Sequence, residues 1–298
     1  MELNNGKLRV RLVPQIGGSI IEYSVNRAGQ WIPVMRDGED PLTKSSNASS
    51  FVLVPYSNRL RDGRFVFEGT TYQLRGAEKH AIHGDVRDRA LRVLDHASER
   101  IVLEFRADEC KDINFPFPFS ARVVYALDGF DLSSRIELTN TGSRAMPAGC
   151  GFHPYFQRRL PGSIGEVELQ FAVRGVYPGD TPLPTGPAIP IPAELDFRVP
   201  RPLDITLDHC FAGWNRQAVI DWPGSGIKAR IQADAGMEHV VLYSPKGESF
   251  FAFEPVTNAN DGFNLFAQGD RHCGVVALHP GESLRVGFHL YMEVDGSI

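Results

Sequence analysis

Alternation of polar and apolar residues recurs along this chain and limits the available folds more than any other feature of the sequence. The pattern is clearest in residues 7–14, 64–68, 100–106, 120–125, 131–140 and 283–291. Successive side chains of a strand point to opposite faces, so this alternation predicts half-buried β-strands. Turn sequences such as Asp62-Gly63 and Asp128-Gly129 separate the runs, and no segment has a long helical period with caps. The sequence therefore predicts an all-β sandwich or barrel.

The length and the distribution of prolines favour one large domain over residues 1–298. Hydrophobic residues make up 42% of the 298 residues, which is enough for a full core and argues against disorder. Eight of the 21 prolines lie between Pro178 and Pro202. We interpret this stretch as a long surface loop rather than a linker, because alternating strands continue on both sides of it.

Charge and cysteine usage exclude several classes of protein. The net charge of −5 gives no reason to expect nucleic acid or an anionic membrane as a partner. No apolar run approaches the roughly 20 residues that span a bilayer, and Met1–Gly6 lacks the features of a secretory signal. The four cysteines are scattered without CxxC spacing, as expected for reduced thiols. We expect a cytoplasmic protein that is a monomer or a homodimer.

Two separated motifs combine the side chains needed for acid/base chemistry. Phe152-His153-Pro154-Tyr155-Phe156 places an imidazole beside a proline and aromatic rings, which could form an apolar wall for a sugar. Glu254 ends the apolar run that begins at Phe250. A histidine and a carboxylate in partly dry surroundings form a minimal acid/base pair. Taken alone, His153 could equally be a core histidine.

Three further patches carry polar groups in apolar or turn-rich settings. Asn58 and Arg59 can present an amide and a fork of donors to hydroxyl groups, although a strand end with a surface arginine would look the same. His80, His83 and Asp85 could form a metal site, but no further ligand follows at a recognisable spacing. Asp208, after the proline-rich stretch, would by itself be an ordinary turn residue.

Nucleotide-binding and esterase signatures are absent from the sequence, which has no Walker loop, GxGxxG fingerprint or GxSxG elbow. We therefore expect no nucleotide cofactor.

Taken in chain order, these patches resemble the aldose 1-epimerase (galactose mutarotase) family over nearly the whole length. The matching motifs are Asn58-Arg59 with Gly63, Phe65, Gly69 and Tyr72; His83-Gly84; His153-Pro154-Tyr155-Phe156; Asp208-His209 with Phe211; Glu254-Pro255 with Asp261 and Asn264; and Leu278–Ser283. Each motif is short, but their common order is hard to obtain by chance. The resemblance implies a large twisted antiparallel β-sandwich that binds a sugar in an open cleft.

The resemblance also implies a role for each matched residue. Glu254 would be the general base and His153 the general acid. His83 would bond near the ring oxygen, and Arg59 and Asp208 would hold hydroxyl groups, accompanied by Asn58. The implied reaction interconverts the α and β anomers of an aldose by ring opening and closure, without a metal or organic cofactor.

Departures from the family pattern leave the substrate open. Asp85 replaces the usual second glycine, Gln157-Arg158-Arg159 follows the aromatic motif, and Val256-Thr257 follows Glu254-Pro255. A free aldose is the main expectation. A hexose 6-phosphate is an alternative, because four arginines near the motifs could bind phosphate: Arg61, Arg64, Arg87 and Arg89.

Two other classes compete with the isomerase. A non-catalytic sugar-binding β-sandwich would keep Arg59 and Asp208 but would not need both His153 and Glu254. A cupin-like metal enzyme would need a tighter cluster of ligands. For the isomerase, we expect a neighbouring carboxylate, either Glu254 or Asp208, to raise the pKa of His153 above that of a free histidine.

Overall fold

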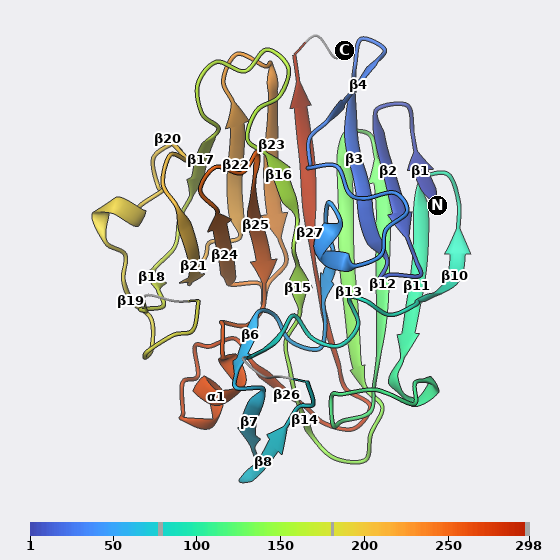
Figure 1. Ribbon diagram of the computed structural model, residues 1–298, viewed down its shortest axis with the longest axis vertical. Helices are drawn as coiled ribbons and strands as arrows, with labels where there is room; N and C mark the ends of the chain where they lie inside the picture. Colours follow the sequence, from blue (N-terminus) through green and yellow to red (C-terminus); the bar gives the residue numbers. More distant parts are fainter. Residues whose placement is uncertain (77–79, 180–181, 296–298) are drawn as a thin grey trace.

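The computed structural model describes residues 1–76, 80–179 and 182–295, and it consists almost entirely of antiparallel strands (Figure 1). The largest sheet has nine strands. Across this sheet the order is β10 (Arg92–His96), β11 (Arg100–Arg106), β12 (Phe119–Asp128), β13 (Asp131–Asn140), β27 (Ser283–Val294), β23 (Ile227–Ala233), β22 (Gln217–Trp222), β17 (Glu168–Phe171) and β20 (Arg201–Pro202).

A second sheet of eight strands lies in front of the first in Figure 1. Its path is β19 (Ile189–Pro190), β18 (Gly175–Val176), β21 (Leu207–Ala212), β24 (His239–Ser244), β25 (Phe250–Val256), β15 (Gly151–Phe152) and β5 (Val52–Leu53), with β16 (Tyr155–Gln157) also paired to β25.

The remaining elements form a four-stranded sheet, three pairs of strands and four short helices or turns. The other strands are β1 (Glu2–Asn4), β2 (Leu8–Val13), β3 (Ser19–Arg27) and β4 (Gln30–Pro33) in one sheet, and the pairs β6 (Arg59–Arg61) with β9 (His80–Ile82), β7 (Arg64–Phe67) with β8 (Thr70–Gln73), and β14 (Met146–Ala148) with β26 (Val276–Leu278). The helices are α1 (Gly262–Ala267) and the 3₁₀ turns η1 (Ser45–Asn47), η2 (Ala107–Glu109) and η3 (Ala193–Leu195).

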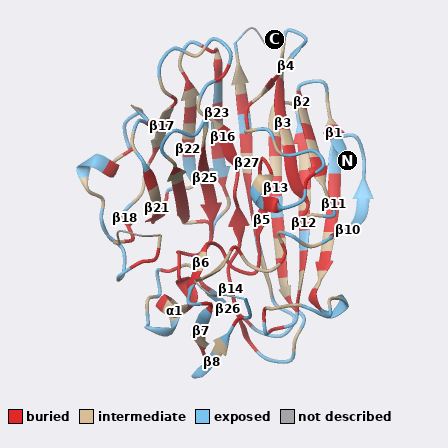
Figure 2. Cartoon of the chain, in the orientation of Figure 1, coloured by how far each residue is buried: buried red, intermediate tan, exposed pale blue. Residues whose placement is uncertain are grey.

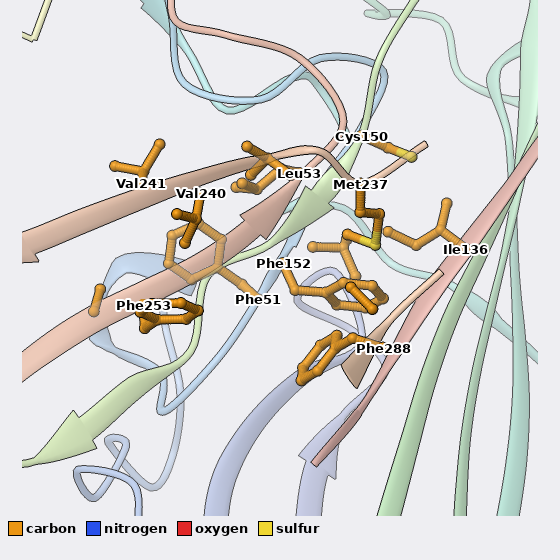
Figure 3. Close-up of a cluster of buried hydrophobic side chains, with 14 of the residues drawn as sticks. Phe51, Leu53, Ile136, Cys150, Phe152, Met237, Val240, Val241, Phe253 and Phe288 are labelled. Carbon is orange, nitrogen blue, oxygen red and sulfur yellow. The ribbon is translucent and has the colours of Figure 1, made fainter. Parts of the chain in front are cut away.

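The two large sheets pack face to face through aromatic side chains. Phe152 of β15 meets Phe288 of β27 with ring centroids 5.1 Å apart, and Figure 3 shows this pair within the core. Phe171 of β17 likewise meets Phe253 of β25 at 5.2 Å. Edge-to-face aromatic pairs of this kind stabilise a core beyond the area they bury. In Figure 2 many of the buried residues accordingly lie along the strands, while β10 and many of the loops are exposed.

The structure confirms the all-β antiparallel sandwich expected from the alternating pattern. The runs at residues 120–125 and 131–140 become β12 and β13, which pair over ten positions from Phe119↔Asn140 to Asp128↔Asp131. Burial in β12 alternates strictly along most of its length, as a half-buried strand requires.

In the described part of the proline-rich stretch, the only elements are two-residue strands and η3, and they lie along the edges of both large sheets. This agrees with its interpretation as surface chain. Within the part of the chain that the structure describes, no helix has the length and apolarity needed to cross a bilayer.

Candidate functional site

The polar side chains singled out in the sequence converge in one cleft of about 240 Å³ at the eight-stranded sheet. The cleft is lined by Asn58, Arg59, Ile82, His83, His153, Tyr155, Asp208, Tyr243 and Glu254. All six residues expected to act on a substrate are therefore in the lining, although as many as 196 residues of sequence separate them.

Sheet register brings Asp208 and Glu254 to the same face. Asp208 of β21 is paired with Tyr243 of β24, and Tyr243 is paired with Ala252 of β25. Paired residues share a face of the sheet, and so do residues two apart on one strand. Asp208, Tyr243 and Glu254 consequently point into one cleft.

The short β6–β9 pair carries the Asn58, Arg59 and His83 side of the cleft. The Asn58 side-chain oxygen accepts the Arg59 backbone N–H at 2.9 Å, and the Asn58 carbonyl accepts the His83 backbone N–H at 2.8 Å. Gly84 follows with φ +73°, and a Cβ there would lie 1.9 Å from the carbonyl oxygen of Val54. Only glycine fits this close approach, which holds His83 against the sheet.

His153 connects β15 to β16, and its ring is clamped between two aromatic rings. Its backbone N–H donates to the Phe51 carbonyl at 2.9 Å. The imidazole stacks on Phe51 at a centroid distance of 4.6 Å and lies 4.4 Å from the ring of Tyr155. His83 meets the His153 ring edge-on at 5.2 Å. The aromatic wall expected from the sequence is thus built partly by Tyr155, whereas Phe156 stacks on Phe251 in the core.

The two principal candidates for catalysis are in direct contact. His153 Nε2 lies 3.2 Å from Glu254 Oε1, and the two side chains are 6% and 2% exposed. Glu254 Oε2 has no hydrogen-bond partner among the described residues. A buried carboxyl oxygen of this kind favours a ligand that can supply a hydroxyl group.

Burial shifts the pKa values of this pair in opposite directions. Burial raises the pKa of Glu254 well above its ordinary value, and the nearby Asp208 carboxylate raises it further. Burial lowers the pKa of His153 well below that of a free histidine, and the charges of Arg36 and Arg87 lower it further. The free site therefore favours a neutral pair, with the shared proton on the carboxyl group.

The expectation that a neighbouring carboxylate raises the pKa of His153 is therefore wrong for this geometry. The ring stack removes the imidazole from water, and two arginines lie where the sequence suggested only acidic neighbours. Asp208 acts on Glu254 instead.

The other ionisable groups of the cleft are also shifted. Burial raises the pKa of Asp208, while Arg59 opposes this shift. Burial lowers the pKa of His83 well below its ordinary value, with further lowering by His153, Arg87 and Arg59. Both histidines are therefore neutral hydrogen-bonding groups in the free site.

The candidate metal ligands point to separate partners. His80 Nδ1 accepts the backbone N–H of Asp62 at 3.1 Å, while the ring of His83 faces His153. The Asp85 carboxylate accepts the backbone N–H of Phe115 and pairs with Arg89 at 2.8 Å. Among the described residues, no group of three or more His, Cys, Asp or Glu side chains could hold a metal ion. Asp85, in the position of the usual glycine, anchors a loop.

The four arginines considered for phosphate do not gather into one site. Arg61 donates to the carbonyl oxygen of Pro184 at 2.9 Å, and Arg89 is held by Asp85 and Asp112, each at 2.8 Å. Arg64, Arg87, Arg61 and Arg89 all lie outside the residues that line the cleft. Of the four, only Arg87 influences both histidines of the cleft.

Three residues of the site were not predicted from the sequence. Tyr243 enters through its register with Asp208, Phe51 through its stack on His153, and Arg36 through its contact with Tyr155. None belongs to a motif, and only the short β-branched apolar run at residues 240–243 could have placed Tyr243 on a strand.

A larger hollow of about 670 Å³ lies elsewhere, beside β18 and β24, and includes His239. His239 Nδ1 bonds the Thr257 carbonyl at 2.8 Å, and its Nε2 lies 3.5 Å from the Tyr177 hydroxyl. His239 is thus engaged in the fold, and among the described residues neither imidazole of the hollow, His239 or His272, forms an ion pair with a carboxylate. The chemistry, rather than the volume, identifies the smaller cleft as the candidate site.

Comparison with known proteins gives one consistent family. The sequence model of the family described as Aldose 1-epimerase matches residues 1–291. The uncharacterized Escherichia coli (strain K12) protein YphB is 29% identical over 98% of each chain, and the uncharacterized YihR of the same organism is 27% identical over 80% of this chain and 78% of its own. A candidate aldose 1-epimerase from E. coli K12 superposes with a TM-score of 0.84 at 26% identity, covering 98% of both chains. The GalM/aldose epimerase homologue from C. elegans shares the fold, with a TM-score of 0.82 at 20% identity over 99% of this chain and 98% of that one.

Proposed function

The chain belongs to the aldose 1-epimerase family, and from this premise we propose that it interconverts the α and β anomers of a free aldose. The observation that carries the proposal is the buried contact of 3.2 Å between His153 Nε2 and Glu254 Oε1 in a cleft lined with hydroxyl-binding groups. Mutarotation removes a proton from O1 and delivers one to the ring oxygen O5. An adjacent acid and base can serve both atoms.

The pair carries one proton throughout the proposed cycle. In the free site that proton lies on Glu254, as the opposite pKa shifts of the two groups require. Its transfer to His153 gives a carboxylate and an imidazolium. The carboxylate then takes the O1 proton while the imidazolium protonates O5, and the C1–O5 bond breaks to give the open-chain aldehyde. This step returns the neutral pair.

Ring closure reverses the two transfers. Glu254 returns a proton to O1, and His153 takes the proton from the O5 hydroxyl as that oxygen attacks C1. Rotation about C1–C2 before closure presents the other face of the carbonyl, so the opposite anomer forms. No proton is gained or lost, and no redox or organic cofactor is needed for the balance.

The rest of the lining fits the recognition of sugar hydroxyls. Arg59 offers a planar fork of donors, Asp208 offers acceptors, and Asn58 supports Arg59 through the bond to its backbone N–H. His83 is neutral and lies edge-on to His153, where one ring nitrogen can bond near O5. Tyr243 supplies an aromatic face for stacking on the pyranose, whereas Tyr155 lines the cleft beside His153.

Two alternatives make different use of the same cleft. A hexose 6-phosphate would need cationic side chains in the lining, where Arg59 is the single arginine among the cleft residues described above. A non-catalytic sugar-binding module would have no need for a buried pair with opposite pKa shifts, which costs the fold stability. Isomerisation of a free aldose therefore accounts for more of the observed features of the cleft than either alternative.

Polarimetry on freshly dissolved α-aldoses, with one hexose 6-phosphate in the panel, tests the proposal. We expect the protein to accelerate mutarotation of at least one free aldose, and a chelator to leave that rate unchanged. Acceleration of the phosphate ester alone would move the assignment to the hexose 6-phosphate class. Calorimetric sugar binding without acceleration would make the protein a binding module.

A further inference from the structure

His153 is the central member of a stack that ends in an arginine at each side. The order is Arg87, Phe51, His153, Tyr155 and Arg36. The Arg87 guanidinium carbon lies 5.7 Å from the Phe51 ring centroid. The two aromatic rings enclose the imidazole at 4.6 and 4.4 Å. At the other end, the Arg36 guanidinium carbon is 3.4 Å from the Tyr155 ring centroid, which is a close cation–π contact.

Arg36 is held firmly at this position by groups other than carboxylates. Its Nε donates to the Ala48 carbonyl at 2.9 Å, and its Nη2 donates to the Ser46 carbonyl at 2.5 Å. Its guanidinium also lies 4.6 Å from the ring of Phe250, so it sits between two aromatic rings. Its backbone N–H donates to the Tyr155 carbonyl at 2.9 Å. The side chain and the backbone of Arg36 are thus both tied to the strand that follows His153.

The two arginines of the stack differ in how far their charge is neutralised. Arg87 has an acidic neighbour, with its Nε 3.5 Å from Asp88. None of the ion pairs found in residues 1–76, 80–179 and 182–295 includes Arg36. An arginine remains charged at any ordinary pH, and Glu248 offsets the charge of Arg36 only from beyond ion-pair distance. Arg36 therefore places a positive charge one ring away from the imidazole. Arg36 accordingly lowers the pKa of His153 more than Arg87 does.

We propose that Arg36 is a positioning residue that acts through Tyr155, holding the imidazole of His153 between two rings with a fixed positive charge behind the second ring. The ring oxygen of a sugar is a weak base. A stronger acid therefore lowers the free-energy barrier to the proton transfer that opens the ring. The inference rests on the proposed function for its purpose, but the effect of Arg36 on His153 can be measured without substrate.

The other groups that face His153 set the background for this effect. They are Glu254 from β25, His83 after β9, Tyr155 from β16, Arg87, and Asp208 from β21 acting through Glu254. Burial holds the pKa of Tyr155 at about 12, so this ring stays neutral over the working range. Arg36→Met changes none of these residues, so a change in the titration of His153 reports the loss of Arg36.

Arg36→Met is the test variant, because it keeps much of the apolar stem and removes the charge. Loss of a positive charge favours the protonated imidazole. His153 should therefore titrate at a higher pH. For a unit charge one ring away and an effective dielectric near 20, its proton affinity should increase on the order of tenfold. Arg36→Lys keeps the charge and should restore most of the native titration.

Histidine-selective NMR titration of the free protein gives the primary readout, with His153→Asn used to assign the resonance. The acid limb of kcat/KM should move to higher pH in Arg36→Met, with little change in KM. The reason is that the form with both His153 and Glu254 protonated, which is inactive, then appears at higher pH. Arg158→Met is the matched control. Arg158 is also partly buried and donates to a carbonyl, that of Leu203 at 2.8 Å, but it is not part of the stack.

The outcomes separate the inference from the function on which it rests. An unchanged His153 titration in Arg36→Met overturns the role of Arg36, whatever the activity. Equal shifts in Arg36→Met and Arg158→Met would also overturn it, by showing a general effect of net charge. A shifted titration in a protein that accelerates no mutarotation would leave the stack intact and refute the proposed function.

Discussion

Glu254→Gln should reduce kcat by about two to four orders of magnitude and leave the fold almost unchanged. The amide has the same shape as the carboxyl group but cannot exchange a proton, and a general acid or base contributes about 10²- to 10⁴-fold. That range corresponds to about 3–5 kcal/mol of transition-state stabilisation. Glu254 is neutral in the folded site, because burial raises its pKa. An amide is neutral in both the folded and the unfolded chain, so Glu254→Gln removes the cost of protonating the carboxyl group on folding, and the melting temperature at pH 7 should not fall.

The contact between Glu254 and His153 predicts strong non-additivity. The two groups share one proton over 3.2 Å, so removing either one disables both transfers. His153→Asn should cause a loss of similar size, and the double variant should lose no more than about tenfold beyond the worse single variant. Independent contributions would instead multiply, as groups that act separately do.

Polarimetric progress curves on the best aldose, with calorimetric Kd values for the same sugar, measure both effects. Melting curves of each variant separate lost chemistry from lost structure. Near-native turnover in Glu254→Gln would remove this residue as the base. Fully multiplicative losses in the double variant would contradict a shared proton, even if each single loss were large.

Three further predictions concern groups around the pair. Asp208→Asn should move the alkaline limb of kcat/KM to lower pH, because Asp208 helps to raise the pKa of Glu254; an unmoved limb in the pH profile would show that this charge is too far away. His83→Asn should raise KM more than it lowers kcat, since its expected role is to orient the sugar, and the reverse split in steady-state kinetics would give it a catalytic role. Burial lowers the pKa of His239 to about 4, so its stabilising effect is complete above the unfolded value near 6.5 and is lost as pH falls below that value. The contribution of His239 should accordingly be about 2 kcal/mol smaller at pH 5 than at pH 7; denaturant unfolding of the native protein and of His239→Asn at both pH values measures it, and an equal difference between the two proteins at both pH values would contradict the buried neutral histidine.

Local patterns were sufficient to predict the fold class. Alternation at residues 131–140 predicts a strand with one buried face, and β13 has those bounds. The period of two results from the geometry of a single strand, so it can be read without knowing the partners of that strand. The order of the strands in the two large sheets has no such local signal, because it depends on pairings between segments far apart in the chain.

The residues of the cleft could be named from short motifs, but their arrangement could not. His153 and Glu254 are about a hundred residues apart in sequence, and only the pairing of β16 and β15 with β25 brings them to 3.2 Å. Tyr243 enters the cleft by register alone.

The sequence by itself determined that the chain is an antiparallel β protein with the side chains of an acid/base site, since residue identities and their period along a strand are local properties. The tertiary structure alone decided the direction in which the pKa of His153 is shifted. The pKa of His153 is lowered because the fold buries the ring between Phe51 and Tyr155 and places Arg36 behind it. Burial and charge proximity are relations between distant segments, and no motif in the sequence contains them.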